Sequence, residues 1–407
     1  MKINMKIKDK DIKTIVPSLR FPEFRDAEGW EQTTFENTCE MQAGKFVSAS
    51  DIYEKRENEM YPCYGGNGLR GYTYSFTHSG VYLLIGRQGA LCGNVTFVDE
   101  TFHATEHAVV VTCKEGIVPH WLYYQFTKSN LNQYATGQAQ PGLSVEVIKK
   151  IAVSIPKENN KQIGNKEQQK IADCLGSLDD LISVVTDKIE ALKEYKKGLM
   201  QQLFPAEGKT TPTLRFPEFQ NAGEWDEILL GNISTFINGR AYKQNELLES
   251  GKYRVLRVGN FFSNNNWYYS NLELEDNKYC IKGDLLYAWS ASFGPRMWNE
   301  EKVIFHYHIW KVIEHKGISK DFLFTLLSHE TERIKKQQAK GLGLLHITKE
   351  AIEGWKTRIT KNVLEQQKIA DFLSSVDKLI SAETDKLDQL KTHKKGLMQQ
   401  LFPTINK

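Results

Sequence analysis

A block of residues that occurs twice constrains the fold of this chain more than any other feature. Residues 167–205 read EQQKIADCLGSLDDLIS…TDK…KKGLMQQLFP, and residues 365–403 read EQQKIADFLSSVDKLIS…TDK…KKGLMQQLFP, a shift of 365 − 167 = 198. Apolar residues in the block step by four and three, the heptad pattern of helices that pair along a narrow seam. We predict two long helices, each about 55 Å long at 1.5 Å per residue, that pair within the chain. The seam positions are Ile171, Leu175, Leu178, Ile182, Val185, Ile189 and Leu192 in the first copy and Ile369, Leu373, Val376, Ile380, Leu387 and Leu390 in the second.

A second, shorter repeat lies upstream of each helix. Residues 17–24 read PSLRFPEF and are followed by Trp30, and residues 212–219 read PTLRFPEF and are followed by Trp225, a shift of 212 − 17 = 195. The chain is therefore two tandem halves, each with an entry motif, a globular insert and a long helix. The predicted domains are a basic tail (1–16), a first globular domain (17–160), a first helix (161–205), a linker (206–211), a second globular domain (212–360) and a second helix (361–407).

The two inserts, residues 36–160 and 231–360, share a faint common skeleton. Strands are expected at 81–85 and 284–288, and again at 107–111 and 308–312. A helix should follow in each, with Pro119 and Ser319 at its start and Gly137 and Gly341 at its end. The fold class is α+β: two globular α+β domains, related by a pseudo-two-fold axis and held apart by two long antiparallel coiled-coil helices.

The antiparallel arrangement is favoured because a parallel pair would crowd both inserts at one end, whereas an antiparallel pair gives both halves equivalent surroundings. Lys196 and Lys394 occupy the same position of the seam, and Glu383 stands where the first copy has Val185. These polar residues fit two interpretations. They are side chains that reach to solvent at frayed positions, or they fix the register and direction of the pair.

Composition excludes several classes of protein. The 407 residues suffice for two or three domains, and a formal net charge of +3 gives no general signal for nucleic acid, although a local basic face remains open. Six scattered cysteines without a CxxC support neither a zinc site nor a disulfide framework. No apolar run approaches the roughly 18 residues of a membrane span, and the Lys-rich start has no apolar segment of a signal peptide. We predict a cytoplasmic protein without membrane contact.

No set of residues predicts catalysis, because nucleotide-binding and metalloprotease motifs are absent. Asp284 with Glu300 and Lys302 loosely resembles a nuclease pattern, but such spacing is common by chance in charged chains. His306 and His308 point to one face of an expected strand. A metal would need further ligands, so packing or hydrogen bonding is the favoured role. We predict neither catalytic residues nor a metal site.

The inserts do offer polar and basic residues among glycines and aromatics. Arg and Lys suit guanine edges and phosphates, Gln and Asn suit adenine edges, and Gly permits close approach of the backbone. Their concentration in loops of both inserts predicts contacts with DNA. The candidates are Lys45, Asn67, Arg70, Arg87, Gln88, Gln138 and Gln140 in the first insert and Arg240, Tyr242, Lys243, Arg257, Ser290, Ser292, Arg296 and Lys340 in the second.

Several of these stretches resemble the specificity (S) subunits of type I restriction-modification systems. The stretches are LRFPEF…W in each half, GDLLYAWSASFGP with FHYHIWKV in the second insert, and the repeated EQQKIAD…KKGLMQQLFP block. The resemblance implies that the inserts are target-recognition domains and the helices conserved spacers. It implies a non-catalytic subunit that reads a bipartite, asymmetric site in double-stranded DNA. Two modification (methyltransferase) and two restriction (translocase and endonuclease) subunits would join it, and S-adenosylmethionine, ATP and magnesium would belong to those partners, with no cofactor in this chain.

Two points stay open at this stage. The aromatic residues of the entry motifs fit contacts with partner subunits, but they equally fit a role in fastening each insert to the helices; these are Phe21, Phe24, Trp30, Phe216, Phe219 and Trp225. The competing functions are a stand-alone nuclease or methyltransferase and a two-headed adaptor that binds proteins or glycans. In the DNA-reading interpretation, the helix pair suits half-sites about one helical turn apart.

Overall fold

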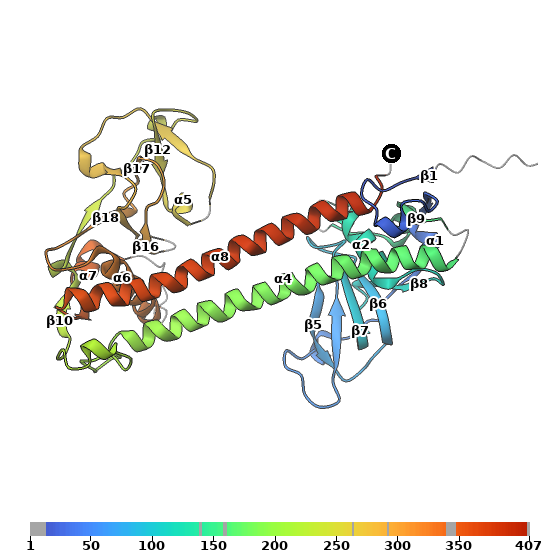
Figure 1. Ribbon diagram of the computed structural model, residues 1–407, viewed down its shortest axis with the longest axis horizontal. Coiled ribbons are helices and arrows are strands. Elements are labelled where there is room, and N and C mark those ends of the chain that lie inside the picture. Colours follow the sequence, from blue (N-terminus) through green and yellow to red (C-terminus); the bar gives the residue numbers. More distant parts are fainter. Residues whose placement is uncertain are drawn as a thin grey trace, which may run out of the picture. The chain divides into compact units, whose positions relative to one another are not determined.

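The computed structural model (Figure 1) describes residues 14–137, 141–157, 161–262, 264–290, 293–338 and 347–404. Among the predicted positions, Gln138, Gln140, Ser292, Lys340, Gly341 and residues 1–13 of the tail lie outside the described residues. The chain forms two compact units, which are Met1–Thr186 with Asp385–Lys407, and Asp187–Thr384. Each unit therefore holds one insert, the first part of one long helix and the last part of the other.

A six-stranded sheet forms the centre of the first unit, in the order β3-β8-β6-β7-β4-β5. Only the β4–β7 pair is parallel. Side chains along each strand alternate between the two faces of the sheet. Leu83 and Val111 pack against helix α2 (Pro119–Lys128), whereas Leu84 and Val110 pack on the opposite face. The strands are β3 (Cys39–Ala43), β4 (Tyr61–Gly65), β5 (Gly68–Thr73), β6 (His78–Gly86), β7 (Val95–Ala104) and β8 (Ala108–Cys113).

Helix α2 begins as predicted but ends early. Pro119 lies in its first turn, where its missing N–H is not needed. The expected end at Gly137 is wrong, because the helix stops at Lys128 and Asn130 adopts a left-handed conformation with φ of 45°. A 3-10 turn, Leu131–Tyr134, then continues the chain.

Each insert is closed at its base by the strands that enter and leave it. In the first unit β2 (Trp30–Thr34) pairs with β9 (Ala152–Pro156), and in the second β10 (Asp226–Leu229) pairs with β19 (Lys356–Ile359). Thr14 and Ile15, which the prediction assigned to the basic tail, instead form strand β1 (Thr14–Ile15) beside β2.

The second unit repeats this topology with its sheet divided in two. The orders are β11-β18-β15-β16 and β13-β12-β17-β14. The parallel pair β12–β17 corresponds to β4–β7, and the long strands β6 and β7 each correspond to two short ones, because β15 pairs with β16 and β14 with β17. The prediction of two inserts with one α+β architecture is confirmed. The strands are β11 (Ser234–Asn238), β12 (Tyr253–Leu256), β13 (Tyr268–Ser270), β14 (Tyr279–Cys280), β15 (Leu285–Ala288), β16 (Gly294–Met297), β17 (Val303–Phe305) and β18 (Ile309–Glu314).

Helix α6 (Lys320–Gln338) covers the second insert as α2 covers the first, and it begins directly after Ser319 as predicted. No helix among the described residues is both long and apolar enough to cross a membrane. The short helices are α1 (Phe35–Thr38), α3 (Val145–Lys149), α5 (Val258–Phe262) and α7 (Lys349–Glu353).

The repeated block forms the two long helices α4 (Lys161–Leu203, 43 residues) and α8 (Val363–Leu401, 39 residues). Within each unit the start of one helix lies beside the end of the other (Figure 1). In the first unit Leu175 of α4 shares a core with Leu401 of α8, and in the second unit Leu373 of α8 shares a core with Leu203 of α4. The predicted antiparallel pairing is therefore confirmed. All the predicted seam residues are buried or half-buried.

Candidate nucleic-acid interface

A buried ion pair joins each entry motif to its helix. Arg20 Nε and Nη2 donate to the two carboxylate oxygens of Glu167 at 2.8 Å each, and both side chains are nearly buried. Arg215 binds Glu365 in the same bidentate way, at 2.7 and 2.9 Å. We call these two pairs the clamps. They explain why the Arg of LRFPEF and the Glu of EQQ occur together in both halves.

The next residue of the helix motif holds the insert itself. Gln168 Oε1 accepts a hydrogen bond from the backbone N–H of Val118 at 2.9 Å, and its Nε2 donates to Gly116 at 3.2 Å. Gln366 does the same with Ser319 and Gly317 in the second unit. Each glutamine therefore fixes the turn before α2 or α6, so the position of the insert is set by the helix.

The aromatic residues of the entry motifs are mostly buried within their own unit. Trp30, Trp121 and Phe402 have ring centroids 6.0–6.2 Å apart, and Trp225, Phe322 and Phe204 repeat this group at 5.8–6.2 Å. Phe24 and Phe219 are buried, and Phe21 and Phe216 are half-buried against the same cores. This packing supports the fastening role left open by the sequence.

The predicted DNA-contact residues of the first insert gather at one turn. We call Lys45, Gly65, Arg87 and residues 105–107 the first turn cluster. Lys45 N donates to Ala104 O at 2.8 Å, Thr105 N to Tyr64 O at 2.9 Å, and Arg87 N to His107 O at 2.9 Å. A hollow adjoins this cluster, and its lining includes Asn67, Arg70 and Gln88, which are exposed. The structure therefore brings together the five described candidates of this insert.

The second insert repeats the arrangement with other side chains. We call Arg240, Arg257, Trp289 and residues 306–308 the second turn cluster. Arg240 N donates to Phe305 O at 3.0 Å, His306 N to Leu256 O at 2.9 Å, and Trp289 N to His308 O at 3.1 Å. These bonds match those of the first cluster one for one. Lys45 thus corresponds to Arg240, Arg87 to Trp289 and Gly65 to Arg257.

Two of the second insert's candidate arginines are engaged within the protein. Arg240 makes a bidentate pair with Glu246 at 2.8 and 2.9 Å, and these hydrogen bonds lower the pKa of Glu246 to about 2. Arg296 donates to Phe261 O at 2.5 Å and lies 3.5 Å from Glu300. The sequence cannot reveal such partners. Both arginines are less available to a phosphate than their residue type suggests.

The other described candidates of the second insert differ in exposure. Arg257 lies over the ring of Tyr268, with 4.7 Å between guanidinium and centroid. Lys243 is exposed and Ser290 is half-exposed, whereas the hydroxyl of Tyr242 is buried. Burial, with smaller effects from His308 and Arg257, lowers the pKa of His306 to about 4. Among the described residues no group of three or more His, Cys, Asp or Glu could hold a metal.

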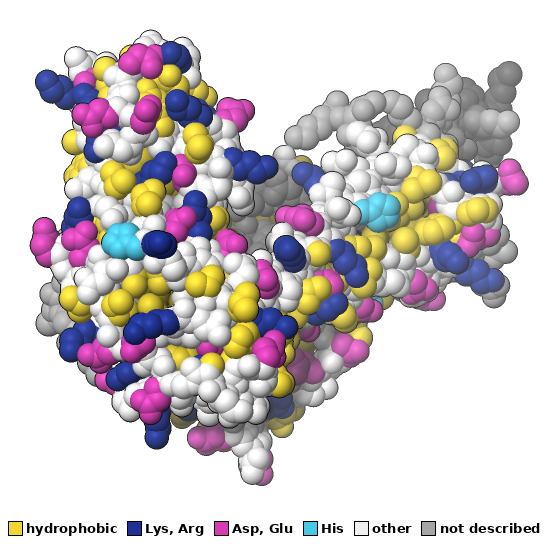
Figure 2. All heavy atoms as spheres, turned by 60° about the vertical axis from the view of Figure 1, so that its left-hand side comes forward, with side chains coloured by type: hydrophobic (Ala, Val, Ile, Leu, Met, Phe, Trp, Pro, Cys, Tyr) yellow, Lys and Arg dark blue, Asp and Glu magenta, His cyan; other side chains and the backbone are white. Residues whose placement is uncertain are grey.

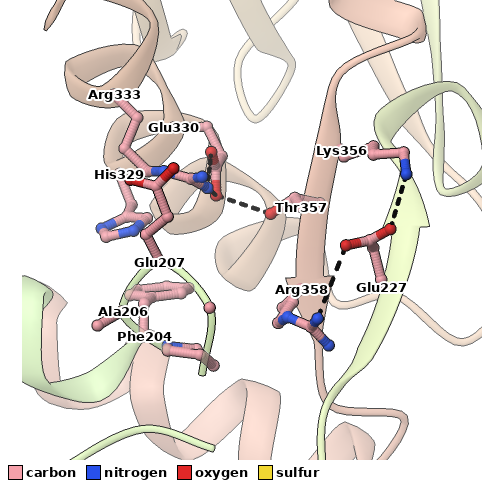
Figure 3. Close-up of a pocket in the computed structure, with 12 residues that line it drawn as sticks. Phe204, Ala206, Glu207, Glu227, His329, Glu330, Arg333, Lys356, Thr357 and Arg358 are labelled. Carbon is pink, nitrogen blue, oxygen red and sulfur yellow. Dashed lines mark hydrogen bonds and ion pairs between the residues drawn. The ribbon is translucent and has the colours of Figure 1, made fainter. Parts of the chain in front are cut away.

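Charge does not mark an interface on the face drawn in Figure 2, where basic and acidic side chains are interspersed rather than gathered by sign. A hollow in the second unit (Figure 3) shows the same balance, since Arg333 and Thr357 bind Glu330 at 2.7 Å each. In the same hollow Lys356 and Arg358 lie 2.9 and 3.6 Å from Glu227. These five charged side chains of the hollow are paired with one another.

Sequence reasoning missed the residues of the first turn itself. Thr105, Glu106 and His107 were not candidates, although His107 lines the hollow and Glu106 Oε1 lies 3.1 Å from its Nε2. In the second turn the sequence singles out only His306 and His308, as a possible metal pattern. The available signal was that both turns follow a strand at equivalent places in the two halves.

A family model described as the type I restriction modification DNA specificity domain matches residues 27–194 and, a second time, residues 222–392. These matches span most of the 407 residues. The chain belongs to this family.

Curated relatives and solved structures agree with that assignment. The type I restriction enzyme EcoprrI specificity subunit of Escherichia coli is 43% identical over 163 residues, 40% of this chain and 39% of that protein, so the alignment spans less than half of either. The MjaVIII specificity subunit of Methanocaldococcus jannaschii is 26% identical over 303 residues, 69% of each. The S subunit structure from M. genitalium has a TM-score of 0.64 at 17% identity and covers 96% of this chain and 100% of its own. A chain from work on complex assembly of the type I R-M system has a TM-score of 0.55 at 12% identity, with 92% and 98% coverage.

Proposed function

We propose that this chain reads a bipartite, asymmetric DNA sequence as the specificity subunit of a type I restriction-modification complex, with each insert contacting one half-site. The observation that supports this most is the pair of turn clusters. The same backbone bonds present Lys45, Arg87 and a Thr-Glu-His turn in one insert and Arg240, Trp289 and a His-Tyr-His turn in the other. One backbone scaffold that carries two different sets of side chains is what two different half-sites require.

The partners follow from the same proposal. Two units with the same internal clamps offer two equivalent surfaces, which suits two copies of a modification subunit, and two restriction subunits would complete the complex. S-adenosylmethionine, ATP and magnesium would act in those subunits. In this proposal the helices α4 and α8 set the spacer between the half-sites, so one heptad added to each should change the spacer and leave both half-sites unaltered.

The test is an exchange of one insert. Residues 36–160 are replaced by the insert of another family member, and DNA modified by the reconstituted complex is sequenced for methylated positions. The expected result is a new first half-site with the second half-site unchanged. A change in both half-sites, or methylation without a defined bipartite site, would overturn the proposal. Cleavage or methylation by the purified chain alone would instead favour a stand-alone enzyme.

A further inference from the structure

Three polar side-chain atoms in the first turn cluster are buried without a hydrogen-bond partner: Arg87 Nε, Thr105 Oγ1 and Glu106 Oε2. Thr105 is fully buried. Native proteins leave few such groups unpaired, because each forgoes the hydrogen bond that it would make with water. Their concentration at one turn indicates a polar site that the protein does not complete by itself.

The turn that bears these atoms is held firmly. Thr105 N donates to Tyr64 O, and Ala108 N donates to Thr105 O at 3.0 Å. The guanidinium of Arg87 reaches the backbone oxygen of Glu106 at 3.4 Å. Glu106 is therefore presented by a backbone that these hydrogen bonds hold in place.

The hollow beside the turn has the chemistry of a base-reading surface. Arg70, Gln88 and His107 line it, together with the glycines Gly65, Gly66 and Gly68. A Cβ built on Gly65 would lie 3.7 Å from Thr105 Oγ1, so the unpaired hydroxyl adjoins this hollow. Glycines here let another surface approach the turn closely.

A carboxylate at such a site discriminates between parts of DNA. It repels phosphates, and in the major groove it accepts hydrogen bonds from the exocyclic amino groups, cytosine N4 above all. The Glu106 side chain is 34% exposed, so its carboxylate can accept a hydrogen bond from a group outside the protein. Resting on the proposed function, we propose that Glu106 reads the exocyclic amino group of one cytosine or adenine in the first half-site.

The second insert has no carboxylate at the position equivalent to Glu106. Position 106 corresponds to Tyr307, which is 38% exposed, and whose backbone oxygen accepts a hydrogen bond from Trp289 Nε1 at 2.8 Å. A phenol cannot replace the carboxylate as a charged acceptor. The effect of Glu106 is therefore confined to the half-site read by the first insert.

The experiment compares complexes containing the wild-type chain, Glu106→Gln, and the matched control Glu100→Gln. Glu100 is exposed on β7, five residues before Thr105, and accepts a hydrogen bond from the phenol of Tyr64 at 2.8 Å. Methylation rates are measured on duplexes that carry every single base-pair change in the target. Glu106→Gln should change discrimination at one base pair of the first half-site about tenfold or more, because the amide loses the charge and one acceptor and gains a donor, which weakens a contact with cytosine and favours adenine. Glu100→Gln should leave discrimination unchanged, and so should Glu106→Gln at the second half-site.

A second measurement needs no variant. The wild-type complex is assayed on duplexes in which one cytosine or adenine at a time lacks its exocyclic amino group. The expected result is one position in the first half-site, cytosine or adenine, whose loss lowers binding about tenfold. If no position depends on its amino group, or if Glu106→Gln discriminates like wild type, the inference is wrong. Failure of the wild-type complex to modify a defined bipartite site would instead reject the proposed function.

Discussion

The clamps and the turn clusters behave differently between the two halves of this chain. The clamps are nearly the same: Arg20 with Glu167 and Arg215 with Glu365 differ by at most about 0.1 Å in their hydrogen bonds. The turn clusters keep the backbone bonds but change the side chains, so that Arg87 is matched by Trp289. A module that attaches in one way but recognises two sequences is expected to show this division. The contacts that fasten each insert to the helices stay the same, and the side chains of the turn clusters differ.

The largest expected effect separates the clamps from ordinary surface pairs. Arg20→Ala and Arg215→Ala should each destabilise their own unit by about 3–5 kcal/mol, because a buried carboxylate is left without its counter-charge. Urea unfolding would measure the loss, and hydrogen exchange would locate it around β2 and α2 for the first variant and around β10 and α6 for the second.

The matched controls lie in the same motifs. Lys170 and Lys368 form exposed pairs with Glu23 and Glu218, at 3.3 and 3.2 Å. Their replacement by alanine should lower stability far less than the clamp variants do, because solvent screens exposed pairs. Equal losses in the clamp and control variants would show that the clamps do not fasten the inserts.

The next effect tests whether the turn clusters share one scaffold. Gly44 and Gly239 precede Lys45 and Arg240, and a Cβ on either would lie 2.3–2.4 Å from backbone oxygens of the turns. Gly44→Ala and Gly239→Ala should each cost about 1–3 kcal/mol through overpacking. Gly198→Ala in α4 is the control, since nothing lies within 4 Å of its Cβ. It should raise stability in urea unfolding by up to about 1 kcal/mol. A harmless Gly239→Ala beside a harmful Gly44→Ala would refute the shared scaffold.

The sequence predicted the helices better than the interface, for a physical reason. A heptad seam is a local pattern, so Leu175 and Leu373 could be assigned without knowing what they touch. The clamps join residues 147 and 150 positions apart, and only the parallel repetition of the two motifs hinted at them. Candidates such as Arg240 were chosen by residue type, which does not reveal a partner such as Glu246. Glu106 could not be predicted, because a single acidic residue in a turn forms no sequence motif that indicates a binding role.

A smaller effect concerns the pH dependence of stability, which should differ between the two turn clusters. The pKa of His306 is lowered to about 4, from about 6.5 in an unfolded chain, whereas the equivalent Thr105 does not titrate. Between pH 6.5 and 4 the unfolded state binds more protons, so stability present above pH 6.5 is lost as the pH falls towards 4. His306→Thr should make the thermal midpoint of the second unit less sensitive to pH in this range. His308 also has a lowered pKa from burial and will retain part of the slope. Identical pH profiles for the variant and wild type would contradict this account.

The smallest effect concerns the polar seam residues. Lys196 Nζ binds Asp377 at 2.7 and 2.8 Å, and Lys394 binds Asp179, so both lysines pair with the facing helix, which supports the register interpretation. Asp179 also accepts a hydrogen bond from Tyr124 at 2.7 Å, whereas Thr325 occupies the equivalent place in the second unit. Both pairs are partly exposed, so each replacement should lower the free energy of unfolding only slightly. Lys394→Met should cost about 1 kcal/mol, and Lys196→Met should cost less, because Thr325 stands where Asp179 has Tyr124 beside it. Urea unfolding of both, with Tyr124→Phe added to each, measures the difference. If Tyr124→Phe reduces the cost of Lys394→Met but not of Lys196→Met, the asymmetry arises from the tyrosine, and the two seams are otherwise equivalent.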